Sequence, residues 1–282
     1  MLERAYIEIT NVCNLFCSFC PKTRREASFM SVEDFTLYAR KLRAYTDCFC
    51  LHVMGEPLLH SRLDAILSVC DVLRARVILT TNGTMLRERG DILLAHPSVY
   101  KVQISLHSFE ANGASSSGSY FTDCFDFARR SSERGIITVL RLWNIDGREE
   151  GYNDKNDEIL KRLRDTFSGF WAPNKRGYCI REKLYLEYDE RFVWPAPDGK
   201  ILSESGRCHA IGKQIAVLCD GTVVPCCLDR EGVIRLGDLK RDDVDTVLSC
   251  PRAKAMTKGF EESGAFSEVL CKTCGYADRF RR

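Results

Sequence analysis

Three cysteines near the N-terminus are spaced closely enough to bind one metal cluster together. They occur as Cys13-x3-Cys17-x2-Cys20, and the aromatic residue Phe19 directly precedes the third. Three thiolates on a short loop can hold three corners of a cubane iron–sulfur cluster and leave the fourth iron open to chemistry. Phe19 could shield such a cluster and stack on an adenine. A zinc site or unrelated buried thiols are the alternatives. We call these three residues the N-terminal cysteines.

A second set of cysteines lies in the last quarter of the chain. It consists of Cys208, Cys226, Cys271 and Cys274, in the order C…Gx4C…CxxC, and we call these four the annex cysteines. The dipeptide Asp220-Gly221 between two apolar runs predicts a hairpin that returns Cys226 towards Cys208. Four thiolates can close a [4Fe–4S] site completely, which suits electron transfer or structure. A zinc ribbon is the alternative, and Cys227 could replace its neighbour Cys226 as a ligand.

The cysteine content also bounds the type of protein. The chain has 15 cysteines among 282 residues, and its N-terminus lacks the apolar stretch of an export signal. We therefore expect metal-bound thiolates in a reduced, cytoplasmic protein rather than a disulfide scaffold. The 41 Lys and Arg residues nearly balance the 39 Asp and Glu residues, so bulk charge gives no support to nucleic-acid binding. No apolar run approaches the roughly 20 residues of a membrane span.

Alternating strand and helix patterns fill the first two thirds of the chain and must position these thiols. The strand-like runs are Ala5–Ile9, Cys48–Met54, Arg76–Thr80, Val99–Leu106 and Ile136–Leu142. The helix-like stretches are Ser31–Tyr45, Ser61–Leu73, Thr84–Ala95, Tyr120–Arg134 and Asn156–Phe167. Repeated βα units predict an α/β fold with a parallel sheet flanked by helices, as in an open or closed barrel. In such folds the chemistry collects at the C-terminal ends of the strands.

The pattern changes after about residue 170. We predict three parts: a barrel core at 1–170, a connecting segment at 171–207 with one late strand at Lys183–Tyr188, and an annex at 208–282. Within the annex, Ile215–Cys219 and Thr222–Cys227 form the predicted hairpin. A helix-like segment follows around Asp243–Gly259 and is interrupted near a proline.

The N-terminal cysteines, with an aromatic residue before the third and a strand before the first, resemble the CxxxCxxC hallmark of the radical S-adenosylmethionine (SAM) superfamily. The order of the annex cysteines resembles the SPASM domain, and more closely its shortened twitch form. The resemblance implies a partial (β/α)6 TIM-like barrel with a small C-terminal twitch (half-SPASM) iron–sulfur annex. It implies a SAM-binding [4Fe–4S] cluster on the N-terminal cysteines. Since a full SPASM domain has further cysteines after CxxC and Gly275–Arg282 has none, we expect one auxiliary [4Fe–4S] cluster on the annex cysteines.

Polar residues at the ends of successive predicted strands support the resemblance. Met54-Gly55-Glu56-Pro57 resembles the family's GGE-type motif, with Met in the first Gly position, and this implies contacts from the backbone and Glu56 to the SAM amino group. Asn82, in a Thr-Asn-Gly sequence, and Ser105 resemble polar positions of the family that bind SAM. Arg141, at the end of the fifth strand, could clamp the SAM carboxylate or form a surface salt bridge.

The resemblance implies that an electron from the first cluster cleaves SAM to methionine and a 5′-deoxyadenosyl radical, which takes a hydrogen atom from the substrate. We expect a two-electron oxidation in which the auxiliary cluster accepts the second electron or orders the substrate pocket. A reduced flavodoxin or ferredoxin is the expected electron donor, because the cluster needs a low potential. His107, beyond the fourth strand, could exchange a proton near neutral pH or be a structural histidine.

Three alternatives to this reaction remain open. A peptide-modifying maturase is one, because many SPASM proteins act on ribosomal peptides; several carry a leader-binding domain before the barrel, whereas here the first strand begins within the first ten residues. A glycyl-radical activating enzyme shares CxxxCxxC but not the twitch pattern. A non-enzymatic zinc or iron–sulfur binding module is the alternative outside enzymes. The sequence does not decide between a small-molecule and a peptide substrate.

Overall fold

The computed structural model describes residues 1–109, 118–145 and 154–280. Its strands form one sheet of 11 strands in the order β11-β10-β9-β1-β2-β3-β4-β5-β8-β7-β6. The strands are β1 (Arg4–Ile7), β2 (Cys48–Cys50), β3 (Arg76–Thr81), β4 (Val99–Ser105), β5 (Ile137–Ile145), β6 (Ala172–Asn174), β7 (Gly177–Arg181), β8 (Leu184–Glu190), β9 (Gln214–Val217), β10 (Thr222–Val224) and β11 (Gly237–Asp238). The six strands β1 to β5 and β8 pair in parallel, which confirms the predicted partial barrel.

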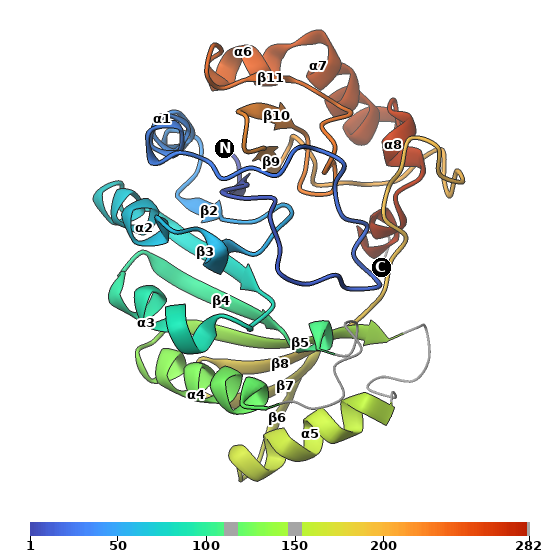
Figure 1. The fold of residues 1–282 in the computed structure, drawn as a ribbon. Helices are drawn as coiled ribbons and strands as arrows, with labels where there is room; N and C mark the ends of the chain where they lie inside the picture. Colours follow the sequence, from blue (N-terminus) through green and yellow to red (C-terminus); the bar gives the residue numbers. More distant parts are fainter. Residues whose placement is uncertain (110–117, 146–153, 281–282) are drawn as a thin grey trace.

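Helices cover the outer side of this curved sheet in the barrel core (Figure 1). They are α1 (Val32–Arg43), α2 (Leu63–Val72), α3 (Leu86–Ala95), α4 (Tyr120–Glu133) and α5 (Asp154–Thr166). The annex adds the hairpin of β9 and β10 and the helices α6 (Val244–Ser249), α7 (Pro251–Lys258) and α8 (Val269–Lys272). No helix in the described part of the chain is long and apolar enough to cross a membrane.

Helix α1 shows how sequence pattern becomes structure in this fold. The Ser31 side chain caps it by accepting a hydrogen bond from the Asp34 amide at 2.9 Å. Its buried residues recur at helical spacing, at Phe35, Tyr38, Ala39 and Leu42. This apolar stripe packs on the sheet, whose central strands are buried on both faces, as in β2.

The structure corrects the predicted connecting segment. It contains the antiparallel strands β6 and β7 in addition to the late strand β8, and β7 pairs with β8. The sequence of β6 is short, exposed and carries Pro173, so it has the composition of a loop although it forms a sheet edge. The annex also shares the sheet of the core, because β9 pairs in parallel with β1. The domain boundaries at residues 170 and 207 stay a prediction.

Candidate active site

The N-terminal cysteines lie on the loop between β1 and α1, at the C-terminal end of the first strand. Cys17 is buried, whereas Cys13 and Cys20 are partly exposed, and all three are free thiols. The Cys20 amide donates to the Cys17 carbonyl at 3.1 Å, which turns the loop between these two residues. Three thiols on one turn of chain are a donor set that suits an iron–sulfur cluster with one open iron.

Asn82, at the end of β3, holds this cysteine loop in place. Its Nδ2 lies 3.8 Å from the Cys13 sulfur and donates to Asn14 Oδ1 at 2.9 Å. Its Oδ1 accepts hydrogen bonds from the backbone amide and the hydroxyl of Thr84. Asn82 therefore contacts a predicted cluster ligand directly. Its contact with SAM stays a prediction.

The Met54-Gly55-Glu56-Pro57 motif packs against the same loop from the end of β2. Gly55 adopts a φ of +77°, and a Cβ atom at this position would lie 2.5 Å from the Thr10 carbonyl oxygen. The Glu56 amide donates to the Val12 carbonyl at 2.8 Å, directly before Cys13. Only glycine permits this close approach of the two backbones.

The carboxylate of Glu56 is fully buried and is bound by the protein itself. It accepts hydrogen bonds from the Thr81 hydroxyl, the Asn82 amide and the Leu58 amide at 2.8, 2.7 and 3.0 Å. Burial raises its pKa to about 7, although these donors act in the opposite direction. Pro57 opens the short 3-10 helix Pro57–Leu59 that follows. Both oxygens of the Glu56 carboxylate thus accept hydrogen bonds from the protein itself. A contact from the Glu56 side chain to SAM stays a prediction.

Glu8 is a site residue that sequence reasoning missed. Its carboxylate is completely buried at the end of β1 and forms an ion pair with Arg25 of the cysteine loop at 2.6 Å. It also accepts hydrogen bonds from the amides of Met54 and Cys219, at 3.3 and 3.1 Å. The available signal was a lone carboxylate within the apolar run Ala5–Ile9, where an unpaired charge would be costly.

Further contacts connect the cysteine loop to the annex. Arg25 Nε donates to the Arg230 carbonyl, and Arg230 Nε donates to the Lys22 carbonyl, both at 2.7 Å. The Glu231 carboxylate accepts hydrogen bonds from the Thr23 hydroxyl and the Arg24 amide. The loop that carries the N-terminal cysteines is therefore anchored to the annex as well as to the barrel.

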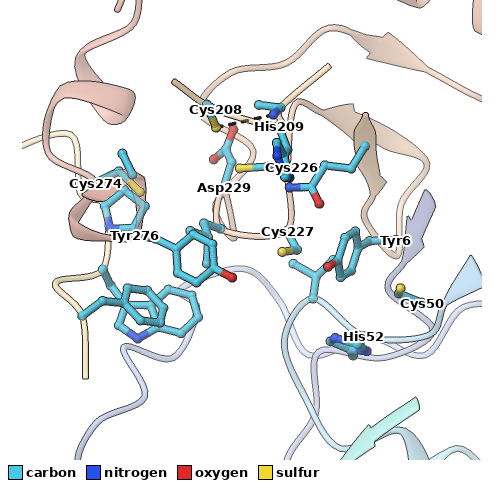
Figure 2. A pocket seen from close by; sticks show the side chains of 18 of the residues that line it. Tyr6, Cys50, His52, Cys208, His209, Cys226, Cys227, Asp229, Cys274 and Tyr276 are labelled. Atoms are coloured by element: carbon cyan, nitrogen blue, oxygen red, sulfur yellow. Dashed lines mark hydrogen bonds between the residues drawn. The ribbon is translucent and has the colours of Figure 1, made fainter. Parts of the chain in front are cut away.

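One cavity of about 590 Å³ joins the inner face of the barrel to the annex. All four annex cysteines line it, as do Phe19, His107 and Arg141 among the predicted site residues. The predicted residues that do not line it are Cys13, Cys17, Cys20, Gly55, Glu56, Pro57, Asn82 and Ser105. Figure 2 shows Cys208, Cys226 and Cys274 around the annex side of the cavity, and Cys227 turned towards Tyr6.

The annex thiols are close enough to affect one another's ionisation. Burial raises the pKa of Cys226 well above its usual value, and Cys227 and the other three annex cysteines raise it further. Burial raises the pKa of Cys274 to about 11. Among the described residues, no three Cys, His, Asp or Glu side chains are close enough to hold a single metal ion. The four thiolates that bind a [4Fe–4S] cluster need not be this close together, because each iron of the cluster takes its own thiolate. The four annex cysteines therefore fit a [4Fe–4S] cluster.

Cys227 has a different partner from Cys226. It forms a hydrogen bond with the Tyr6 hydroxyl, while burial raises its pKa to about 11. Cys226 interacts electrostatically with all three other annex cysteines. These contacts favour Cys226 as the ligand, and the choice between the two stays a prediction.

His107 faces the cavity as a neutral ring. Its Nδ1 lies 3.1 Å from the Arg141 carbonyl oxygen and 3.3 Å from the Trp143 amide nitrogen, and its ring lies 4.9 Å from that of Phe19. Burial lowers the pKa of His107 to about 4. At neutral pH the imidazole is therefore uncharged, and the lowered pKa makes it a weak base.

Arg141 lies inside the barrel, in register with Ser105 of β4 and Glu187 of β8. Its guanidinium stacks 4.1 Å from the ring centroid of Trp143. Burial lowers its pKa to about 10, against the opposite influence of Glu187. It lines the cavity and forms no ion pair with a described residue. The choice between a contact to SAM and a salt bridge stays a prediction.

A chain of polar side chains crosses the inner face of the barrel, which the sequence did not indicate. The Thr80 hydroxyl donates to Gln103 Oε1 at 3.0 Å and lies 3.3 Å from His52 Nε2. These residues belong to or follow β2, β3 and β4 and line the cavity. Their positions alternate with buried apolar residues, and this period of two was the signal that could have placed them on the inner face.

Comparison with protein families gives two matches along the chain. A model described as the radical SAM superfamily matches residues 7–164, and a model described as an iron–sulfur cluster-binding domain (SPASM) matches residues 208–275. The chain is 23% identical over 290 residues to the antilisterial bacteriocin subtilosin biosynthesis protein AlbA of Bacillus subtilis (strain 168), covering 95% of this chain and 64% of AlbA. It is 29% identical over 170 residues to the GTP 3′,8-cyclase of Aquifex aeolicus (strain VF5), covering 56% and 51%. The chain thus spans less than two thirds of these curated relatives.

Solved structures share the fold over nearly the whole chain. The complex of BtrN with AdoMet and 2-DOIA matches with a TM-score of 0.59 and 18% identity, over 97% of this chain and 93% of BtrN. Streptococcus suis SuiB bound to the precursor peptide SuiA matches with a TM-score of 0.56 and 14% identity, over 98% and 70%. At these identities the likeness shows the architecture of core and annex.

Proposed function

Because the chain belongs to the radical SAM superfamily and carries a SPASM iron–sulfur domain, we propose that it cleaves SAM reductively and takes a hydrogen atom from a substrate bound in the cavity. SAM and [4Fe–4S] clusters are the cofactors that these two domains imply. The observation that carries the proposal is the cavity of about 590 Å³, which has Phe19 of the cysteine loop and the four annex cysteines in its walls. A substrate there would lie between Phe19 of the cysteine loop and the annex cysteines. The volume is within the ~300–1,000 Å³ of small-molecule pockets.

The N-terminal cysteines would hold the first cluster and leave one iron for SAM. When bound, the cluster supplies the electron that yields the 5′-deoxyadenosyl radical. Asn82 donates a hydrogen bond to the sulfur of Cys13, and Phe19 offers a ring for the adenine. Backbone groups around Gly55 and the side chain of Ser105 are the proposed contacts to the amino acid part of SAM.

The annex cysteines would hold the auxiliary cluster. Their place in the wall of the substrate cavity supports a role in a two-electron oxidation, because a redox group there lies beside the substrate. His107 lines the cavity and is the proposed proton acceptor, a role that its lowered pKa opposes until the bound substrate changes its surroundings. Reduced flavodoxin or ferredoxin is the proposed electron donor.

A peptide-modifying maturase is the second candidate. The likeness to AlbA covers 95% of this chain, and AlbA is named for the biosynthesis of a bacteriocin. SuiB, which has the same architecture, has been solved bound to its precursor peptide SuiA. A peptide side chain could enter the same cavity. Deuterium transfer into 5′-deoxyadenosine from labelled candidate peptides or small molecules would separate the two candidates.

The first test is the iron and sulfide content of protein purified without oxygen. About eight irons and eight sulfides per chain, the content of two [4Fe–4S] clusters, is the expected result. About four irons with one zinc would leave the first cluster and make the annex a structural zinc site. A protein with zinc alone would contradict the proposed function and support a non-enzymatic module. The match to the radical SAM family argues against that module.

A further inference from the structure

Two cations on neighbouring strands face the cavity without an opposite charge in contact. Lys101 of β4 and Arg141 of β5 both line it, and neither forms an ion pair with a described residue. The charged residues in the cavity wall are Arg4, Lys101, Arg141, Arg176, Arg191, Glu187, Glu190 and Asp229. The Asp229 carboxylate already accepts hydrogen bonds from the amides of Val233 and Ile234. The wall therefore has more positive than negative charge, and one of its carboxylates is already bound to backbone amides.

Burial makes the charged forms of Lys101 and Arg141 less favourable, and this lowers the pKa of both residues. Burial lowers the pKa of Lys101, and the guanidinium of Arg141 lowers it further, while Glu187 acts in the opposite direction. Burial also lowers the pKa of Arg141. A desolvated cation without a bound counter-ion is unfavourable, and proteins keep such groups chiefly where a ligand supplies the missing charge.

The cavity also contains buried polar atoms without a partner. Within the described part of the chain, Arg141 Nε, Trp143 Nε1 and His52 Nδ1 are buried and make no hydrogen bond. All three belong to residues that line the cavity. His52 Nδ1 is an acceptor, because His52 Nε2 faces the Thr80 hydroxyl that donates to Gln103. Guanidinium and indole N–H groups are donors only, so a ligand that satisfies Arg141 and Trp143 must bring acceptors. Oxyanions do so with charge-assisted hydrogen bonds, which are the strong ones.

We infer that the inner face of the barrel binds an anionic group of the substrate, a carboxylate or a phosphate, between Lys101 and Arg141. This inference rests on the proposed function, since the anion is part of the molecule that loses hydrogen. SAM also carries a carboxylate, and Arg141 is at the strand end where SAM is expected. Lys101, however, lies near the start of β4 (Val99–Ser105), deeper in the barrel than the strand ends. In the register of β4 and β5 it lies opposite Ile137, four residues before the pair of Ser105 and Arg141. This distance from the strand end favours the substrate over SAM as the partner of Lys101.

Titration of simple anions into the cluster-loaded protein tests the site. Pyrophosphate and glutarate represent phosphate and carboxylate, and 1,3-propanediol is the uncharged control. Binding heat is measured with and without saturating SAM. We expect an anion to bind, the diol not to bind, and the anion's affinity to be unchanged by SAM. If saturating SAM abolishes binding of the anion, the site belongs to the SAM carboxylate and the inference is overturned.

Variants of Lys101 make the test specific. Lys101→Met should weaken anion binding about tenfold or more, because a charge-assisted hydrogen bond is lost, while Lys101→Arg should retain it within a few-fold. Lys254→Met is the matched control, since Lys254 is exposed on α7, and it should bind as wild type does. Equal affinity of Lys101→Met and wild type would overturn the inference.

The melting temperature of the same variants separates binding from a structural role. Removing an uncompensated, partly buried charge should leave the melting temperature of Lys101→Met equal to or above that of wild type. A lower melting temperature with unchanged anion binding would assign Lys101 to structure. A protein that binds the anion but cleaves no SAM would contradict the proposed function alone, and one that cleaves SAM but binds no anion would contradict this inference alone.

Discussion

Arg25 Nη2 lies 2.6 Å from Oε1 of Glu8, and the Glu8 carboxylate is completely shielded from solvent. The same carboxylate accepts hydrogen bonds from the amides of Met54 and Cys219. One buried acid thus joins the end of β1, the cysteine loop, the segment before Gly55 and the annex hairpin. The ion pair is therefore one of the contacts that hold the cysteine loop against the annex hairpin.

Arg25→Gln should destabilise the protein by about 3–5 kcal/mol, because it leaves the Glu8 carboxylate buried and unpaired. Arg24→Gln, at the exposed neighbouring position, should have little effect. The double variant Glu8→Gln/Arg25→Gln should recover part of the loss, since both charges are removed together. Chemical unfolding under anaerobic conditions measures all three. Equal stability of Arg24→Gln and Arg25→Gln would contradict the role of the pair.

Asn82→Ala should lower the reduction potential of the first cluster on the order of tens of millivolts. Hydrogen bonds to the sulfur ligands raise the potential of iron–sulfur clusters, and Asn82 Nδ2 is 3.8 Å from the Cys13 sulfur. Thr84→Ala removes the hydroxyl that donates to Asn82 Oδ1 but keeps the Asn82 side-chain amide. The shift in potential caused by Thr84→Ala should therefore be smaller. Redox titration followed by electron paramagnetic resonance measures the potential. An unchanged potential in Asn82→Ala would show that this amide does not tune the cluster.

Cys226→Ala should lose the auxiliary cluster and reduce iron from about eight to about four per chain, whereas Cys227→Ala should keep about eight. The physical reason is that Cys226 interacts with all three other annex cysteines, while Cys227 is hydrogen-bonded to Tyr6. Iron analysis of the two variants side by side distinguishes the two thiols. Loss of iron in Cys227→Ala with full iron in Cys226→Ala would reverse the assignment.

Glu56 should make the protein less stable as the pH rises. Burial raises its pKa from 4.5 to about 7, so the folded state holds this proton more tightly than the unfolded chain. Its contribution to stability is therefore complete below the unfolded pKa and is lost as the pH rises through the folded pKa. Between about pH 5 and about pH 8, the free energy of unfolding should fall by about 2 kcal/mol relative to Glu56→Gln.

Urea unfolding at several pH values measures this difference. Glu33→Gln, at an exposed position in the first turn of α1, should keep the pH dependence of wild type. If Glu56→Gln and wild type show the same pH dependence, then Glu56 is ionised throughout the range and its three donors outweigh burial.

The parts of the fold that depend on local sequence were predictable. Helix α1 has its cap at Ser31 and its apolar stripe within one segment. The hairpin of β9 and β10 turns at Gly221, which adopts the positive φ of +94° that glycine favours. The N-terminal cysteine pattern is likewise local, and the annex pattern consists of short motifs in a fixed order. Both patterns carried the family resemblance that the family models confirm.

The contacts that organise the site were not predictable, because they join distant parts of the chain. Glu8 and Cys219 are separated by 211 residues, and nothing in either segment indicates the other. The strand β6 was not predicted, because its own residues do not have the composition of a strand. It is extended because it pairs with β7. The inward direction of Lys101 and Arg141 likewise depends on the register of β4 and β5.

The proposed function requires the N-terminal cysteines to form a site that cleaves SAM. The most direct measurement is 5′-deoxyadenosine formed by the anaerobic, iron-loaded protein with dithionite and SAM, compared with Cys17→Ala and with Cys70→Ala, which removes a thiol buried in the core. We predict 5′-deoxyadenosine from wild type and Cys70→Ala and none from Cys17→Ala. Absence of 5′-deoxyadenosine from iron-loaded wild type, or equal formation by Cys17→Ala, would contradict the proposed function.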